Sequence, residues 1–198
     1  MRNIFITQGV YKDKNNTIYT RLDYDWYKYA NKLKFSIFPI PYDKKINFLN
    51  FSKIDGIIFS GGNDLYSKKK ADINLIRDNY EKQIFYKTIN KKIPKMFICR
   101  GMQLLADIYN IKIHKTDGHV KKNHLIEIAQ KKINVNSFHN YKIFKNPKKF
   151  KTLALHNDGS IEMMEYKQKL ILSMMFHPER KSISQNKVDL IFKNFFKI

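Results

Sequence analysis

Short apolar runs alternate with segments of helical periodicity along the first 110 residues, and this alternation limits the fold more than any other feature. Four runs have the length and apolar character of buried strands: 3–7, 36–41, 54–62 and 94–99. Three segments between and after them have helical length and apolar spacing: 22–34, 74–92 and 100–110. Strands and helices that alternate in this way predict a parallel sheet with right-handed crossovers.

Beyond residue 110 the pattern changes to short β-like segments. They lie at 111–114, 124–129, 133–139, 151–156 and 170–177. The segment 186–198 has the pattern of an amphipathic helix that closes the chain. We therefore predict one α/β domain over 1–198, with a mostly parallel central sheet flanked by helices in three layers and extra β elements in its C-terminal half.

The charge balance is strongly basic, with 38 Lys and Arg against 17 Asp and Glu and a formal net charge of +21. A nucleic-acid-binding protein would have such a charge. Here the lysines are spread along the chain in short groups, and no nucleic-acid-binding motif accompanies them. We expect solvated surface lysines and no nucleic-acid partner, although the positive field would steer an anionic small molecule.

The sequence gives no sign of a membrane protein or a disulfide-bonded protein. No apolar run approaches the roughly 20 residues that a membrane span needs, and the N-terminus becomes polar too soon for a signal peptide. The single cysteine cannot form an internal disulfide. We expect a cytoplasmic protein with a free thiol.

That cysteine, Cys99, falls between an expected strand and an expected helix, with Gly101 two residues later. A sharp turn at such a junction exposes a nucleophile, and the nearby glycine lets the backbone bend without a Cβ clash. Amide dipoles at a helix N-terminus also favour the thiolate. Taken alone, the segment is equally compatible with a buried structural cysteine.

A second segment supplies the partners that a nucleophilic cysteine needs. His177 ends an apolar strand, and Glu179 follows two residues later. The imidazole can accept the thiol proton, and the carboxylate can orient the ring and stabilise its cation. The pair Gly61-Gly62 follows another strand, so that the amides of Gly62 and Arg100 could form an oxyanion hole.

Five motifs in this order carry a family resemblance: 56–65, 98–105, 135–143, 156–166 and 174–180. Together with 21–30 and 76–81, they resemble the class I glutamine amidotransferase-like fold, a flavodoxin-like architecture, and most closely its γ-glutamyl hydrolase branch. The resemblance implies a catalytic triad of Cys99, His177 and Glu179, with no metal and no cofactor. It also implies hydrolysis of a γ-glutamyl amide through a glutamyl thioester.

The resemblance further implies a pocket for the glutamyl part of the substrate. The residues expected to line this pocket are Gly61, Asn63, Gln103, Ser137, Phe138 and His139. The chain departs from the family at Phe97, where relatives usually have Gly. It also departs at Asn140-Tyr141, where relatives often have His-Gln, and this second difference bears on substrate identity rather than on the reaction.

Among the standalone members, the chain is similar in size and in its Lys-, Asn- and Ile-rich character to hydrolases of γ-glutamyl-CDP-amidate in bacterial capsule biosynthesis. Such a reaction releases glutamate and cytidine diphosphoramidate. Arg100 and the loop 68–70 are the cations expected to contact an anionic, nucleotide-linked substrate. The alternative for these residues is a structural role for Arg100 and solvation of the lysines.

Other functions remain open at this stage. The chain could be a γ-glutamyl-GABA-type hydrolase, a glutaminase subunit that delivers ammonia to a synthetase, or a nucleic-acid-binding protein on an inactive hydrolase fold. His114, His119 and His124 recur every five residues, but no nearby carboxylate or cysteine completes a metal ligand set with them. Neither the leaving amine nor the oligomeric state follows from the sequence.

Overall fold

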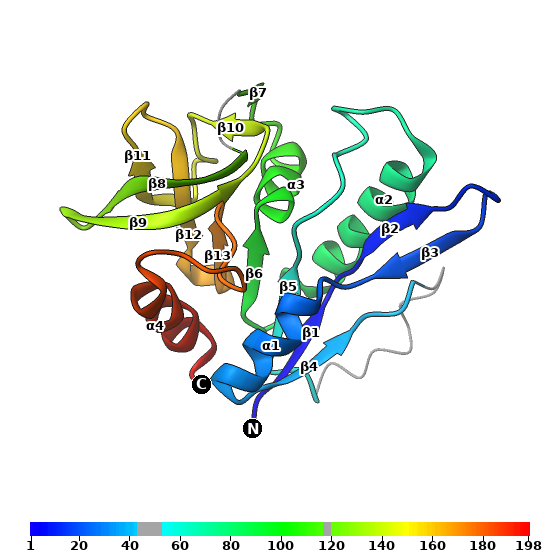
Figure 1. The fold of residues 1–198 in the computed structure, drawn as a ribbon, viewed down its shortest axis with the longest axis horizontal. Helices are drawn as coiled ribbons and strands as arrows, with labels where there is room; N and C mark the ends of the chain where they lie inside the picture. Colours follow the sequence, from blue (N-terminus) through cyan, green and yellow to red (C-terminus); the bar gives the residue numbers. More distant parts are fainter. Residues whose placement is uncertain (43–52, 117–119) are drawn as a thin grey trace.

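A nine-stranded sheet runs through the computed structural model, which describes residues 1–42, 53–116 and 120–198 (Figure 1). From one edge to the other the strands are β4 (Ser36–Pro39), β1 (Asn3–Ile6), β5 (Gly56–Phe59), β6 (Lys95–Ile98), β13 (Ile171–Met174), β12 (Ile161–Tyr166), β11 (Lys151–His156), β8 (Val120–Ile128) and β9 (Lys131–Phe138). The strands from β4 to β13 pair in parallel, and those from β12 onward pair antiparallel. The expected mostly parallel sheet with added β elements is confirmed.

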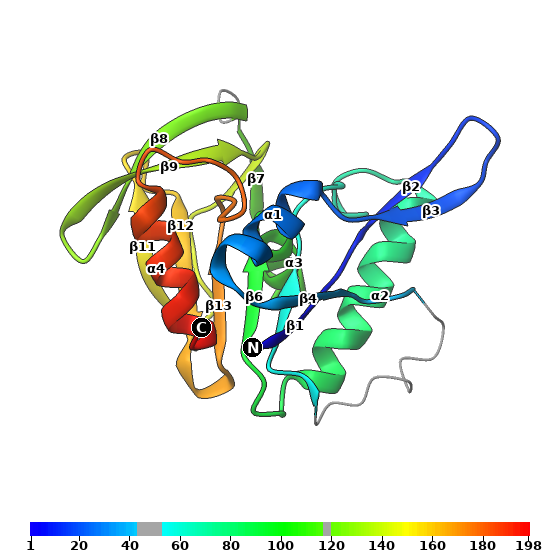
Figure 2. The same cartoon turned by 60° about the horizontal axis from the view of Figure 1, so that its bottom comes forward.

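Four helices cover the two faces of this sheet. Helices α2 (Asp72–Thr88) and α3 (Arg100–Ile108) pack on one face, and α1 (Tyr24–Leu33) and α4 (Gln185–Phe196) pack on the other. Figures 1 and 2 show the three layers from two directions. None of the helices in the described ranges is long and apolar enough to cross a bilayer.

Helix α1 shows how local sequence sets these elements. Asp23 caps its N-terminus by accepting a hydrogen bond from the amide of Asp25 at 3.1 Å. Lys34 ends the helix in the left-handed conformation, with φ 60° and ψ 53°. The buried face of the helix consists of Trp26, Tyr29, Ala30 and Leu33, the spacing from which the helix was expected.

Several short elements were not expected from the sequence. A hairpin of β2 (Gly9–Lys12) and β3 (Ile18–Arg21) projects from the body of the molecule in both views. The expected β segment at 111–114 is present as β7 (Ile113–Lys115), and it pairs with the unexpected β10 (Tyr141–Ile143) in a small sheet. A 3₁₀ turn spans Lys167–Lys169, and β12 lies inside the large sheet. The unexpected segments were missed because they lack the continuous apolar runs of the central strands, and their pairing depends on distant partners.

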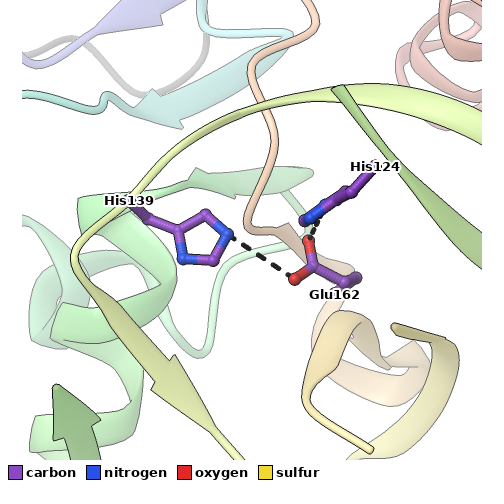
Figure 3. Close-up of side chains that lie close together, drawn as sticks. All are labelled: His124, His139 and Glu162. Atoms are coloured by element: carbon purple, nitrogen blue, oxygen red, sulfur yellow. Dashed lines mark ion pairs between the residues drawn. The ribbon is translucent and has the colours of Figure 1, made fainter. Parts of the chain in front are cut away.

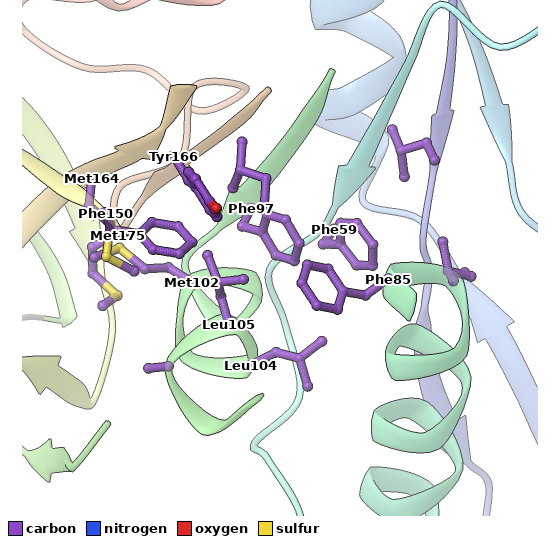
Figure 4. Packing of buried hydrophobic residues seen from close by; sticks show 14 of the residues in the cluster. Phe59, Phe85, Phe97, Met102, Leu104, Leu105, Phe150, Met164, Tyr166 and Met175 are labelled. Atoms are coloured by element: carbon purple, nitrogen blue, oxygen red, sulfur yellow. The ribbon is translucent and has the colours of Figure 1, made fainter. Parts of the chain in front are cut away.

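Phe97 fills the core directly beneath the junction of β6 and α3 (Figure 4). Its ring stacks on Phe59 with a centroid distance of 4.1 Å and an interplanar angle of 2°, and Phe85 meets it edge-on at 5.9 Å. Phe97 is fully buried. The residue that departs from the family pattern is therefore a packing residue of one helix-covered face.

We expect the substitution Phe97→Ala to lower the free energy of unfolding by about 3–5 kcal/mol, because it removes a stacked ring and leaves a cavity in a close-packed core. Urea denaturation followed by far-UV circular dichroism measures this loss. Phe144→Ala is the matched control, since that ring is 41% exposed. Equal and small effects of the two substitutions would contradict the packing role of Phe97.

Candidate active site

The backbone bends sharply at Cys99, between the end of β6 and the start of α3. Cys99 has φ 50° and ψ −102°, a conformation that costs a non-glycine residue about 1–3 kcal/mol. Its amide donates to the carbonyl of Met174 at 2.8 Å, which fixes the bend against β13. A Cβ at Gly101 would lie 2.4 Å from the carbonyl oxygen of Phe59, so that only glycine lets α3 start this close to β5.

His177 follows β13 and is held by Glu179. The ring Nδ1 lies 2.7 Å from Oε1 of Glu179, and only 3% of His177 is exposed. A Cβ at Gly61 would lie 2.5 Å from Cε1 of His177, so the loop after β5 packs directly on the ring. This geometry gives the imidazole one orientation and leaves Nε2 for another partner.

The side chain of Cys99 is one of the groups that act on the pKa of His177. Burial alone would lower the pKa of His177, but the Glu179 carboxylate and the charge and hydrogen bond of the Cys99 side chain raise it to about 10. His177 therefore carries a proton at neutral pH. An imidazolium next to a thiol stabilises the thiolate, the reactive form of cysteine.

Asn136, on β9, fixes the segment that carries His177 and was not singled out from the sequence. Its Oδ1 accepts from the amide of His177 at 2.9 Å, and its Nδ2 donates to the carbonyl of His177 at 2.7 Å and that of Arg180 at 3.0 Å. A buried asparagine that satisfies both backbone groups of one residue has a positioning role. Its position within the 135–143 motif was the only available sequence signal.

The glycine loop after β5 is held by Arg77 from α2. The guanidinium donates to the carbonyl of Ser60 at 2.8 Å, to that of Gly61 at 2.9 Å and to Oδ1 of Asn63 at 3.0 Å. Gly62 has φ 107°, which glycine adopts without strain. The loop is thus rigidly placed beside His177, as an oxyanion-binding loop would need to be.

Asn63 is placed differently from the expectation that it binds substrate. Its side chain accepts from the amide of Val10 at 3.1 Å and donates to the carbonyl of Val10 at 2.8 Å. It also accepts from Arg77. The side chain therefore joins the loop to strand β2.

Arg100 also differs from the expectation, because its side chain is not available to an anionic substrate. The guanidinium is 1% exposed and forms ion pairs with Asp78 and Glu81 of α2. Sequence alone could not show that these two carboxylates meet it inside the protein. The Arg100 amide lies in the first turn of α3, where N–H groups have no partner within the helix, so its proposed place in an oxyanion hole is unaffected.

Four of the residues expected to bind the glutamyl group lie on α3 and around the end of β9. Gln103 is buried one turn along α3, with Nε2 3.9 Å from the sulfur of Met175. Ser137 is buried on β9, and the Phe138 ring meets His177 edge-on at 5.7 Å. The side chain of His139 faces Glu162 rather than His177, with Nε2 3.6 Å from Oε1.

A small hollow of about 60 Å³ lies beside His177 and is bordered by residues of the β2–β3 hairpin. It is lined by Gly9, Tyr11, Arg21, Leu22, Asp23, Trp26, Ser60, Gly61, Gly62, His177, Glu179 and Arg180. Arg180 is paired with Asp23 at 3.0 Å, whereas Arg21 is exposed and lies over the Tyr11 ring at 3.7 Å. The cationic side chains near His177 are therefore Arg21 and Arg180, and not Arg100 or the loop 68–70.

Two of the three lysines expected to contact an anionic substrate have other contacts. Lys68 donates to the carbonyl of Ile113 at 3.0 Å, and Lys70 lies 4.2 Å from the centre of the Tyr66 ring. Of the three evenly spaced histidines, His119 lies outside the described residues. His114 packs edge-on against Phe144, and His124 faces Glu162.

A comparison with known proteins shows which proteins this chain resembles. Residues 19–198 match the family model of class-I glutamine amidotransferases. A γ-glutamyl-CDP-amidate hydrolase from Campylobacter jejuni subsp. jejuni is 36% identical over 160 residues, which cover 80% of this chain and 80% of that protein. A glutamine-hydrolyzing GMP synthase subunit from Methanococcus aeolicus is 30% identical over 156 residues, or 74% of each chain.

Solved structures give the same fold. A candidate GMP synthase subunit from Thermoplasma acidophilum superimposes with a TM-score of 0.76 at 19% identity, covering 100% of this chain and 93% of its own. A glutamine amidotransferase from Thermotoga maritima superimposes with a TM-score of 0.69 at 14% identity, covering 98% and 82%. At these identities the likeness concerns the fold.

We expect the imidazole of His177 to titrate at a pKa of about 10 in the intact protein. The substitution Glu179→Gln should lower this pKa, because it removes the carboxylate that stabilises the ring cation. Histidine NMR over pH 5 to 11, with the His177 resonance assigned through a His177→Asn variant, measures both values. Glu127→Gln, on the exposed side of β8, is the matched control.

The raised pKa of His177 also predicts how the free energy of unfolding changes with pH. A pKa raised on folding stabilises the fold fully below the unfolded value of about 6.5, and the gain is lost as pH rises toward 10. The deficit in unfolding free energy of Glu179→Gln relative to the parent should shrink over that range. A His177 ring that titrates near 6.5 in both proteins would rule out this electrostatic arrangement.

Proposed function

This chain belongs to the class-I glutamine amidotransferase family, and from that premise we propose that it is a cysteine-dependent hydrolase of γ-glutamyl-CDP-amidate. The observation that carries the choice of substrate is the 36% identity to the Campylobacter γ-glutamyl-CDP-amidate hydrolase over four fifths of both chains. The products would be L-glutamate and cytidine diphosphoramidate, in the context of capsular polysaccharide decoration. The hydrogen-bonded His177 and Glu179 beside the bend at Cys99 support the reaction type.

In the first step, the Cys99 thiolate adds to the γ-carbonyl carbon of the substrate. The negative charge on the carbonyl oxygen would be held by the amides of Gly62 and Arg100. His177, protonated at neutral pH, then donates its proton to the amide nitrogen as the C–N bond breaks. The amine-bearing product leaves, and the glutamyl group stays on sulfur as a thioester.

In the second step, neutral His177 removes a proton from a water molecule, which adds to the thioester carbonyl. The C–S bond breaks, glutamate leaves, and the thiolate and imidazolium are restored. Glu179 holds the ring through Nδ1 in both steps, so that Nε2 performs every proton transfer. Dividing amide cleavage in this way replaces one difficult step with two easier ones.

The anionic end of the substrate requires a cation near His177, and Arg21 fits this role. Arg21 lies on β3, is solvent-exposed and lines the hollow beside His177 and Glu179. A guanidinium pairs with diphosphate oxygens through two donors at once. We therefore assign recognition of the diphosphate to Arg21 in place of Arg100 and residues 68–70.

A second candidate function rests on the GMP synthase relatives. These glutamine-hydrolyzing subunits match 74% of this chain at up to 30% identity. A glutaminase subunit would hydrolyse glutamine and pass ammonia to a synthetase partner. That function predicts slow glutamine hydrolysis by the isolated chain and faster hydrolysis with its partner.

Purified protein should release glutamate from γ-glutamyl-CDP-amidate with a kcat/KM that exceeds the values for glutamine and γ-glutamyl-GABA. An enzyme-coupled glutamate assay on these three compounds distinguishes the candidates. Cys99→Ala should lose on the order of 10⁴-fold or more in rate, because it removes the nucleophile. Cys99 is the single cysteine, so alkylation of the parent with iodoacetamide should give the same loss.

Iodoacetamide treatment of the Cys99→Ala protein serves as the control for non-specific damage. Equal activity of Cys99→Ala and the parent would exclude the cysteine mechanism. A preference for glutamine would instead support the glutaminase function.

Arg21→Ala should lower kcat/KM for γ-glutamyl-CDP-amidate by about 10-fold or more, the effect of losing one charge-assisted contact of roughly 1.5–3 kcal/mol. Turnover of γ-glutamyl-GABA, which has no diphosphate, should change little. Arg2→Ala is the matched control, since Arg2 pairs with Asp55 on another face. An equal loss on both substrates would remove Arg21 from diphosphate recognition.

A further inference from the structure

Three potential metal ligands come together on the antiparallel half of the sheet, apart from the cysteine site. His124 comes from β8, His139 from the end of β9 and Glu162 from β12, and Figure 3 shows the two rings turned toward the carboxylate. One ligand atom from each residue lies within 4.8 Å of the others. Nε2 of His124 is 3.3 Å from one carboxylate oxygen, and Nε2 of His139 is 3.6 Å from the other.

Glu162 is the member of this cluster that most needs a cation. It is 1% exposed, and its two carboxylate oxygens face the imidazole nitrogens of His124 and His139 at 3.3 and 3.6 Å. A buried carboxylate is costly unless positive charge or good hydrogen bonds lie close to both oxygens.

The hydrogen bond of His139 shows which of its ring nitrogens could bind a metal ion. Nδ1 of His139 lies 2.9 Å from the carbonyl oxygen of Tyr141, and a carbonyl only accepts, so Nδ1 carries a hydrogen. In the neutral ring, Nε2 then directs its lone pair toward Oε1 of Glu162. Histidines that bind metals typically donate their other N–H to a backbone carbonyl, which fixes the ring and its tautomer.

The distances suit a zinc-sized ion. Zinc lies about 2.0–2.1 Å from imidazole nitrogen and about 2.0–2.2 Å from carboxylate oxygen, which separates two tetrahedral ligands by about 3.3–3.5 Å. The two histidine-to-carboxylate distances are close to this range. A small rotation of the histidine rings toward each other would complete the set, and the side chain of His124, 10% exposed, reaches the surface and offers an entry path.

We propose that His124, His139 and Glu162 are ligands in a binding site for one divalent transition-metal ion of the zinc class. Two imidazoles and one carboxylate favour zinc over magnesium or calcium, which prefer all-oxygen sets. The ion would join β8, β9 and β12. It would also fix the end of β9, where the Phe138 ring contacts His177.

Metal binding tests this proposal independently of any turnover. The protein is treated with a chelator and titrated with Zn²⁺ by calorimetry, in the parent and in a Cys99→Ser background that removes the thiolate as a rival ligand. We expect one ion per chain in both proteins. Titration with Co²⁺ should give the visible spectrum of a four-coordinate nitrogen and oxygen site without a thiolate charge-transfer band.

The variants Glu162→Gln and His124→Ala should weaken Zn²⁺ binding by at least about 10-fold, since each removes a direct ligand. His114→Ala is the matched control, because that ring packs against Phe144 and lies outside the cluster. Binding that is substoichiometric, or equally tight in all variants, would overturn the site.

A crystal of the parent grown with Zn²⁺ provides a second test that does not depend on whether the variants fold. An anomalous peak at the zinc edge between the three side chains supports the site. The absence of a peak there overturns it and leaves a proton shared among His124, His139 and Glu162.

Discussion

The sharp bend at Cys99 is the constraint on which the rest of the site depends. A residue at φ 50° and ψ −102° is strained, and it stays in that conformation only because its surroundings leave no alternative. The Cys99 amide donates a hydrogen bond to the carbonyl of Met174 on β13. Gly101 lets α3 pack against the carbonyl of Phe59 with no side chain between them. The stacked rings of Phe59 and Phe97 make that contact part of the core.

Buried charges connect this bend to the glycine loop. Glu81 accepts from Arg77 at 3.0 Å and from Thr7 at 2.6 Å, and it also pairs with Arg100, the residue after the nucleophile. Arg77 in turn holds the carbonyls of Ser60 and Gly61. Removing one partner of such a buried ion pair leaves an unpaired charge and lowers the free energy of unfolding by about 3–5 kcal/mol. Helix α2 thus fixes the glycine loop and the bend at Cys99 relative to each other.

The sequence was sufficient for the elements whose apolar pattern is local. The strands around 3–7 and 94–99 and the helices around 22–34 and 74–92 are confirmed within a few residues. Cys99 and His177 come shortly after buried strands, and the edge of a parallel sheet brings such positions together, so the sequence could suggest them and Glu179 as partners. Their catalytic role remains a prediction. Contacts between distant residues could not be predicted from spacing. Glu162 lies on a different strand from His124, two hydrogen-bonded neighbours away in the sheet, and the carboxylates that meet Arg100 lie 19 and 22 positions before it on α2.

The central claim is that Cys99 carries the glutamyl group between the two steps of the reaction. Mixing the protein with γ-glutamyl-CDP-amidate, quenching with acid during the first turnovers and mapping the peptides by mass spectrometry tests this most directly. The account predicts one glutamyl group on the peptide that contains Cys99, released as glutamate when the acid-quenched protein is treated with base. A glutamyl group mapped to any other residue, or rapid first turnovers that leave Cys99 unmodified, would contradict it.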